Sequence, residues 1–237
     1  LFYADQLVPT GELFRAMQRG TIDAVQSDDD SMASPTEVTV FGGYFPFASR
    51  YSLDVPVLFN QYGLNEIWDA EYSKVGVKHI SAGSWDPCHF ATKDPINSLE
   101  DIKGKRIRAY GVSADVVEAL GGTAVAMAAP EVYQALERGI LDGVYGFDFV
   151  TAIAYKLHEI APQFYDIGDG PHAPAATIMN KQVYDGLPED VRKVSDEIVD
   201  EIYGGKFSTI YEEVLANYVK TAEAEGVTLS TVSDDQK

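Results

Sequence analysis

Motifs for catalysis and metal binding are absent from this 237-residue sequence. It contains no G-x-S-x-G elbow, no H-E-x-x-H, no Walker loop, no G-x-G-x-x-G after a predicted strand and no Cys/His spacing typical of a metal site. Its single cysteine excludes an internal disulfide, and no apolar run approaches the roughly 18 residues of a membrane span. These absences give no support for an enzyme and predict neither a cofactor nor a metal.

Positive charge is also scarce. The sequence has 18 Lys and Arg against 37 Asp and Glu, which gives a net charge of -19 and a pI near 4.4. This balance argues against nucleic acid or an anionic membrane as a partner and is typical of a secreted or periplasmic protein. Because the overall field repels anions, an anionic ligand must be captured by a local positive charge. The length and the 46% hydrophobic content allow two globular lobes.

The stretch Ile102–Tyr145 predicts a strand, helix, strand, helix and strand in succession. Gly121 and Gly122 can end the first helix, and Pro130 is typical of the first turn of the second. The expected elements are a strand over Lys105–Ala109, a helix over Ala114–Leu120 capped by Ser113, a strand over Ala124–Met127, a helix from Pro130 to Gly139 with Val132, Ala135 and Leu136 on one face, and a strand over Ile140–Tyr145.

A second copy of part of this unit lies near the start of the chain. Gly11–Val25 and Pro130–Val144 align without gaps, and in each copy a helix ends at Arg-Gly before a strand. Two similar α/β lobes are therefore expected. The alternative, a common helix-glycine-strand connection met twice, remains open.

The remaining segments continue the α/β pattern. Ser27–Ser31 is expected to be a loop, in which three successive aspartates either bind a metal or, as we favour, are solvated or cap a helix. The other expected elements are helices over Thr10–Arg19, Asn65–Lys74 and Val150–Ile160, the last with Asp148 as N-cap, strands over Ile22–Gln26, Glu37–Phe41, Leu53–Leu58, Val77–Ala82, Gln163–Ile167 and Ala173–Met179, and long helices from Pro188 to about Glu225 with a break at Gly204 and Gly205.

Arg108 is the residue of most interest. It lies within a predicted strand, just before the turn at Tyr110 and Gly111, and this carboxyl-terminal edge is where open α/β sheets bind ligands. The residues alone leave two interpretations open, a ligand contact or a solvated or ion-paired strand arginine.

Two runs carry a family resemblance. Leu99–Arg108 (L-x-D-[IL]-K-G-K-x-[IL]-R), followed by Glu131–Gly143 (E-V-Y-x-A-L-x-x-G-[IL]-x-D-G), closely resembles the DctP-like extracytoplasmic solute-binding proteins of tripartite ATP-independent periplasmic (TRAP) transporters. The resemblance extends from Tyr3–Leu7 through the run at Leu187 to the C-terminal helices. The family begins with a strand-helix unit that has no counterpart here, so we expect one wall of the ligand cleft to be missing from this sequence, as is a signal peptide.

The resemblance implies an α/β fold of two lobes with a ligand cleft between them and a long C-terminal helix. The expected lobes are residues 1–84 with 175–208, and 85–174 with 209–237. It also implies a monomeric periplasmic protein that captures a small organic acid anion and delivers it to the membrane subunits of a TRAP-type transporter. Two alternatives remain open: the ligand-sensing domain of a receptor and, less favoured, an enzyme acting on the acid.

The resemblance further implies that Arg108 pairs with a ligand carboxylate. A second arginine, present near Cys88 in sialic-acid-binding relatives, is absent here, which favours a monoanion such as an aromatic or short hydroxy or oxo acid and leaves Trp85 or His89 as replacements. Gly146 and Phe147 stand where relatives often have an asparagine, so stacking replaces a polar contact. The complete set of predicted ligand-binding residues is Arg108, Trp85, His89, Tyr44, Phe45, Tyr110, Phe147, Asp148 and His172.

Overall fold

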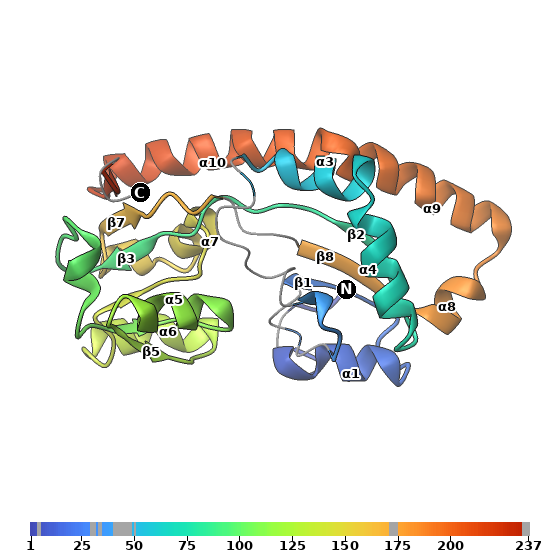
Figure 1. The fold of residues 1–237 in the computed structure, drawn as a ribbon, viewed down its shortest axis with the longest axis horizontal. Helices are drawn as coiled ribbons and strands as arrows, with labels where there is room; N and C mark the ends of the chain where they lie inside the picture. The colour runs from blue at the N-terminus through green and yellow to red at the C-terminus, as the bar shows by residue number, and fades with distance from the viewer. Residues whose placement is uncertain are drawn as a thin grey trace. The chain divides into compact units, whose positions relative to one another are not determined.

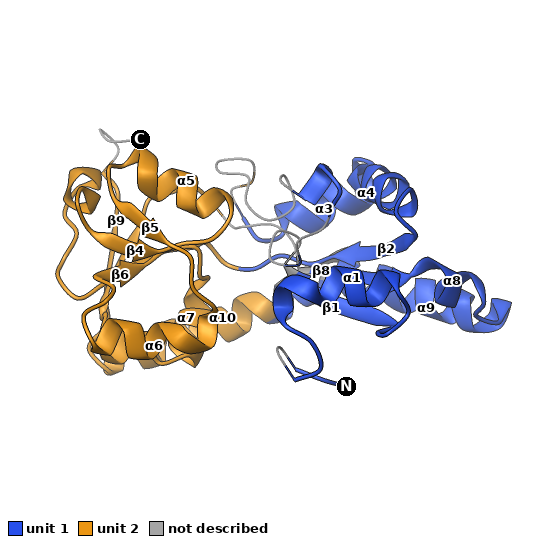
Figure 2. Cartoon of the chain, turned by 90° about the horizontal axis from the view of Figure 1, so that it is seen from below, with its two compact units in different colours: residues 1–45, 51–85, 173–210 blue, residues 46–50, 86–172, 211–237 orange. Residues whose placement is uncertain are grey.

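A computed structural model of the chain describes residues 1–3, 6–28, 32, 35–39, 49, 51–170 and 175–233. The chain forms two compact units (Figure 2). Unit 1 comprises Leu1–Phe45, Tyr51–Trp85 and Ala173–Ile210, and unit 2 comprises Pro46–Arg50, Asp86–His172 and Tyr211–Lys237. Where the sequence suggested breaks after residues 84, 174 and 208, the units divide after 85, 172 and 210, and residues 46–50 group with unit 2.

Unit 1 is built on a three-stranded antiparallel sheet in the order β1-β8-β2 (Figure 1). The strands are β1 (Ala24–Asp28), β8 (Ala175–Asn180) and β2 (Val77–Ala82). The helices of this unit are α1 (Leu13–Gln18, after a 3₁₀ turn at Thr10–Glu12), α3 (Asp54–Gln61), α4 (Leu64–Ser73), α8 (Lys181–Asp185) and α9 (Glu189–Glu201). Phe14, Phe59, Trp68 and Tyr72 are buried between helices and sheet, with Phe59 and Trp68 ring centroids 5.0 Å apart.

Unit 2 contains a six-stranded mixed sheet in the order β5-β4-β6-β3-β7-β9. The strands are β3 (Phe90–Thr92), β4 (Arg106–Arg108), β5 (Thr123–Val125), β6 (Gly143–Val144), β7 (Gln163–Asp166) and β9 (Thr228–Thr231). The helices are 3₁₀ turns at Leu99–Ile102 and Leu157–Glu159, α5 (Val112–Ala119), α6 (Ala129–Glu137), α7 (Phe149–Ala154) and most of α10 (Phe207–Ala224). β4 runs parallel to both β5 and β6.

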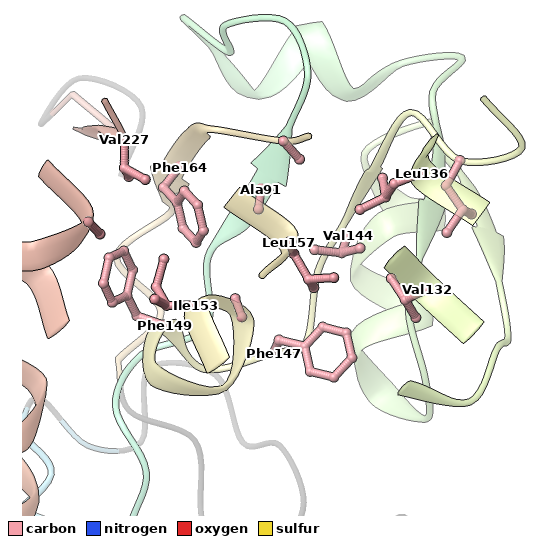
Figure 3. Close-up of a cluster of buried hydrophobic side chains, with 14 of the residues drawn as sticks. Ala91, Val132, Leu136, Val144, Phe147, Phe149, Ile153, Leu157, Phe164 and Val227 are labelled. Atoms are coloured by element: carbon pink, nitrogen blue, oxygen red, sulfur yellow. The ribbon is translucent and has the colours of Figure 1, made fainter. Parts of the chain in front are cut away.

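The core of unit 2 joins residues from several of these elements. Figure 3 shows Phe149 and Ile153 of α7 together with Phe164 of β7 and Val227 beyond α10. Val132 and Leu136 from the predicted apolar face of α6 are fully buried in the same cluster. The helical spacing of these apolar residues in the sequence therefore predicts correctly which face of α6 is buried.

The internal repeat corresponds to two matching connections, α1 to β1 and α6 to β6. In each copy the amide of the glycine donates to the third residue before it, Gly20 to Met17 and Gly139 to Leu136. The amide of the next residue donates to the carbonyl oxygen of the fifth residue before it, Thr21 to Ala16 and Ile140 to Ala135. Both glycines have positive φ, 73° and 70°, a conformation that favours glycine at a helix C-terminus.

Two predicted strands are wrong. Leu53–Leu58 lies largely in α3, because Asp54 accepts a hydrogen bond from the Tyr51 amide (2.8 Å) at the helix start and Pro56 occupies the first turn, where a missing N–H costs little. In the predicted strand Glu37–Phe41, Val38 and Thr39 are helical, and residues 40 and 41 lie outside the described residues.

Several boundaries also differ. Ser113 does not cap α5, which begins at Val112 after Gly111; Ser113 is instead buried within the helix. β6 is shorter than predicted because the amides of Ile140 and Leu141 bond back to Ala135. α7 ends at Ala154 rather than Ile160, the expected break at the glycine pair is a π-helical segment (Ile202–Lys206), and β9 was not predicted.

Gly143 of β6 gives a packing prediction. A Cβ at this position would lie 2.5 Å from Thr92 Cγ2 and 2.7 Å from the Ala91 carbonyl oxygen of β3. Gly143→Ala should therefore lower the free energy of unfolding by about 1–3 kcal/mol. Urea denaturation measures this, with Gly11→Ala as control, since no atom lies within 4 Å of its added Cβ. Equal losses in both variants would contradict the steric argument.

His79 of β2 gives a pH prediction. It is 1% exposed, and burial lowers its pKa to about 3 despite the opposing charge of Asp69. Between about pH 6.5 and 3 only the unfolded chain binds this proton, so stability should fall with decreasing pH, by about 2 kcal/mol from pH 6.5 to pH 5. His79→Gln should lack this component in urea denaturation at several pH values. An unchanged pH dependence in His79→Gln would show that His79 is not its source.

Candidate functional site

Arg108 ends the central parallel strand of unit 2. It pairs with Val125 of β5 and Val144 of β6, so the three strands finish at the same edge of the sheet. The residue is 7% exposed, and its Nε donates to the Met127 carbonyl oxygen at 3.0 Å. The placement predicted from the sequence, a strand-end arginine at the carboxyl edge, is confirmed as geometry, while its ligand role stays a prediction.

Two aromatic rings lie against the Arg108 guanidinium. Its central carbon is 4.1 Å from the centroid of Phe147 and 5.3 Å from that of Tyr110. A guanidinium over a ring face is attracted by the ring quadrupole, and the attraction grows as water is excluded. Phe147 is 8% exposed, whereas Tyr110 is about half exposed, so the site has one buried wall and one accessible wall.

The loops that follow β4 and β6 bring these rings to Arg108. Tyr110 comes two residues after the end of β4 and Phe147 three residues after the end of β6. Gly146 makes the second turn possible, because its φ is 88° and an added Cβ would lie 2.6 Å from Ser113 Oγ. Three of the predicted ligand residues, Arg108, Tyr110 and Phe147, therefore lie together at one edge of the sheet.

Asp148 follows Phe147 and is the N-cap of α7, as predicted. Its Oδ1 accepts a hydrogen bond from the Thr151 amide at 2.8 Å and lies 3.0 Å from the Tyr211 hydroxyl. This carboxylate is 9% exposed. These contacts assign it a structural part in fixing the residue beside Arg108, and its predicted ligand contact remains untested.

His89 and Trp85 have other surroundings. The His89 ring packs against Phe149 and Phe164, with centroids 5.7 and 6.2 Å away, both in the core of unit 2. Trp85 belongs to unit 1, where its ring centroid is 6.3 Å from that of Phe207. Neither contact tests the predicted replacement of a second arginine. Tyr44, Phe45 and His172 lie outside the described residues.

Sequence reasoning missed Asp86 and Tyr211. Asp86 is fully buried, and its Oδ1 accepts a hydrogen bond of 2.6 Å from the Tyr211 hydroxyl on α10. The two residues are 125 positions apart, so no local spacing signalled their contact. Met127 was also missed as a partner of Arg108, because the contact is made by its backbone.

The described residues contain neither a metal-ligand cluster nor a membrane-spanning helix. In that part of the chain no three or more His, Cys, Asp or Glu side chains are grouped as metal ligands. None of the described helices combines the length and apolar character needed to span a bilayer. Unit 1 has a pocket of about 600 Å³, lined by the N-terminal segment and β1, remote in sequence from Arg108.

Comparison with known proteins identifies the family. The model for bacterial extracellular solute-binding protein family 7 (DctP) matches residues 36–237, and the chain belongs to this family. The expected two-lobed α/β class is confirmed by a crystal structure of a TRAP periplasmic solute-binding protein from Chromohalobacter salexigens with bound (S)-2-amino-1-propanol. That protein is 46% identical, with a TM-score of 0.89 over 100% of this chain and 74% of its own.

Two curated relatives are more distant. The C4-dicarboxylate-binding periplasmic protein DctP of Rhodobacter capsulatus is 27% identical over 200 residues, covering 79% of this chain and 58% of the relative. The monocarboxylate 2-oxoacid-binding periplasmic protein of Nostoc sp. is 24% identical over 195 residues, covering 81% and 53%. This chain thus spans a little over half the length of both relatives, which are binding proteins rather than enzymes.

Proposed function

We propose that this chain is part of a periplasmic solute-binding protein that captures a small organic acid anion and delivers it to the membrane subunits of a TRAP-type transporter. The observation that carries this proposal is Arg108, a 7% exposed guanidinium at the carboxyl edge of the parallel strands. The family membership supports the transport role, and the names of both curated relatives support the periplasmic location.

The geometry around Arg108 is what carboxylate recognition requires. The Met127 carbonyl and the Phe147 ring fix the plane of the guanidinium before any ligand arrives. A planar fork held in this way matches the two oxygens of a carboxylate, and arginine keeps its charge at any physiological pH. Preorganisation also reduces the entropy lost on binding.

A monoanion with an apolar or planar body is the ligand we favour. Phe147 and Tyr110 flank the cation, and an aromatic acid or a short hydroxy or oxo acid can contact such rings. Cys88, near which sialic-acid-binding relatives carry a second arginine, is 3% exposed. The relative from Nostoc, named for monocarboxylate 2-oxoacids, supports this class.

A second candidate is a cationic amino alcohol. The 46% identical protein from Chromohalobacter salexigens holds (S)-2-amino-1-propanol, an ammonium compound. The net charge of -19 attracts cations over long distances, whereas it repels the organic acids favoured above. Arg108 is the counterargument, because a guanidinium beside the ligand disfavours a second cation.

In this proposal the protein binds its ligand without changing it chemically and acts as a monomer. Incubation with candidate acids separates this proposal from an enzyme, since a binding protein returns them unchanged. A receptor domain would use the same Arg108 site, and the genes beside the complete reading frame distinguish it: genes for two membrane subunits support transport.

Arg108→Ala should weaken acid binding by roughly tenfold to several hundredfold, because a charge-assisted pair contributes about 1.5–3 kcal/mol. Arg108→Lys should recover little, since the planar fork is lost. Isothermal calorimetry measures both. Arg106→Ala is the matched control on the same strand, because Arg106 is half exposed and pairs with Asp142 at 2.7 Å. Wild-type affinity in Arg108→Ala would remove Arg108 as the anchor.

Three ligands of nearly equal size separate the two candidates: L-lactate, L-alanine and (S)-2-amino-1-propanol. They carry a carboxylate, a carboxylate with an ammonium, and an ammonium alone. A thermal-shift comparison should show stabilisation by lactate, up to about 2.7 kcal/mol at a hundredfold excess over Kd, and none by the amino alcohol. Stabilisation by the amino alcohol alone would select the second candidate and reject the acid.

A further inference from the structure

Asp86, Asp148 and Tyr211 form a buried triad in unit 2, with side chains 0%, 9% and 9% exposed. The Tyr211 hydroxyl lies 2.6 Å from Asp86 Oδ1 and 3.0 Å from Asp148 Oδ1. Backbone amides satisfy further oxygens, with Phe149 N donating to Asp86 Oδ2 at 2.6 Å and Thr151 N to Asp148 Oδ1 at 2.8 Å. The Tyr211 hydroxyl is therefore within hydrogen-bonding distance of both carboxyl groups.

The number of hydrogens in the triad is informative. A tyrosine hydroxyl has one hydrogen, and an ionised carboxylate has none to donate. The hydroxyl can therefore donate to only one of the two carboxyl groups. Its contact with the other is a full hydrogen bond only when that carboxyl group carries a proton and donates it to the hydroxyl oxygen. Two adjacent carboxylates withdrawn from water would also repel each other strongly, as in carboxylate pairs that share a proton. Burial, and then the charge of Asp148, raise the pKa of Asp86.

The triad joins three separate parts of the chain. Asp86 and Tyr211 are the first residues of the two longer segments of unit 2, and Asp148 is the N-cap of α7. An isolated bridge pairs Cys88 with Asp148, and the His89 amide donates to the Phe147 carbonyl oxygen. Phe147, next to Asp148, is the ring against Arg108. The triad therefore connects the first residues of these two segments to Phe147, the ring that lies against Arg108.

We infer that Asp86 and Asp148 share a single proton and, together with Tyr211, act as a clamp that positions Phe147 beside Arg108. Asp86 and Tyr211 are positioning residues that touch no ligand themselves. Loss of the proton would place two charges in the buried site and loosen the turn at Phe147. The consequence for ligand affinity rests on the proposed function of Arg108, whereas the clamp itself does not.

The pH dependence has a defined sign. A carboxyl group whose pKa is raised by folding stabilises the folded state fully below its unfolded pKa, about 4, and loses this contribution as pH rises to the folded pKa. The groups facing the pair are Tyr211 on α10, and His89 and Arg108 on the segments that contact Phe147. A comparison of wild type with Asp86→Asn removes the contributions of His89, Arg108 and the distant His79, which both proteins share.

The first experiment is urea denaturation of wild type, Asp86→Asn and the control Asp115→Asn from about pH 5 to 9. Relative to Asp86→Asn, the folding equilibrium constant of wild type should fall about tenfold per pH unit until the pair loses its proton. Asp115→Asn removes the same charge from an exposed position on α5 and should show a constant ratio. A constant ratio for Asp86→Asn over the whole range would overturn the shared proton.

Two further measurements keep the test decisive if Asp86→Asn does not fold. Asp148→Asn retains an N-capping side chain and should show the same pH-dependent ratio. Infrared spectroscopy of the wild-type protein should detect a protonated carboxylic acid at about pH 7, where ordinary carboxyl groups are ionised. A spectrum without that band rejects the proposal.

Cys88 reports on the clamp directly. It is the only cysteine in the sequence, is 3% exposed and forms an isolated backbone β-bridge with Asp148. At one fixed pH, Tyr211→Phe should increase its rate of labelling by a thiol reagent severalfold, while Asp115→Asn should label as wild type does. Equal rates in wild type and Tyr211→Phe would show that the triad does not hold this turn.

Lactate titrations link the clamp to binding. Wild-type affinity should fall at alkaline pH, and Asp86→Asn should lack this fall; the same fall in both proteins would contradict the coupling to Arg108. If lactate does not bind, or binds Arg108→Ala as tightly as wild type, the proposed function of Arg108 fails. The denaturation, infrared and labelling results still decide the clamp, because they use no ligand.

Discussion

The parallel pairing of β4 with β5 and β6 is the constraint on which the Arg108 site depends. Parallel strands end at the same edge, so the residues that follow them gather there. Met127 comes two residues after β5, Tyr110 two after β4 and Phe147 three after β6. These three residues are the contacts described for the guanidinium, and one register error would move Arg108 to the other face of the sheet.

Burial of charge imposes a second constraint on unit 2. A buried ion is costly unless its hydrogen bonds are met, and removing one partner leaves the other uncompensated. The Arg108 guanidinium donates to a carbonyl group and lies against two rings, whereas Asp86 accepts hydrogen bonds from an amide and a hydroxyl group. The adjacent residues Phe147 and Asp148 take part in both arrangements, which is the physical basis for coupling protonation to the position of Phe147.

The two copies of the helix-glycine-strand connection show how far local similarity extends. Their turns share hydrogen bonds and backbone angles, yet their strands have different neighbours. β6 lies between parallel β4 and antiparallel β3, whereas β1 pairs with antiparallel β8. The copy in unit 2 leads into a turn whose Phe147 lies against the buried Arg108. The repeated segment specifies a turn, and the sheet around it decides what that turn can do.

The sequence by itself determined the elements whose signals are local. The strand Val77–Ala82 has its predicted bounds, the helix predicted over Asn65–Lys74 is observed over Leu64–Ser73, and the apolar face of α6 is buried as its spacing predicts. Arg108 and the rings that follow β4 and β6 could be placed at one edge because that inference needs only strand order and direction. The family motif could also be recognised from the sequence, because each of its two runs consists of consecutive residues.

The tertiary structure alone decided the features that depend on distant partners. Leu53–Leu58 is apolar enough for either a strand or a helix, and it is a helix because Val55 and Phe59 pack on the core of unit 1. His89, a predicted ligand contact, turns its ring to Phe149 and Phe164. Asp86 shows no local signal for its protonation, because Tyr211 and Asp148 reach it from 125 and 62 residues away. Short-range patterns fix local conformation, but burial and the partners of a buried charge are set only when the chain has folded.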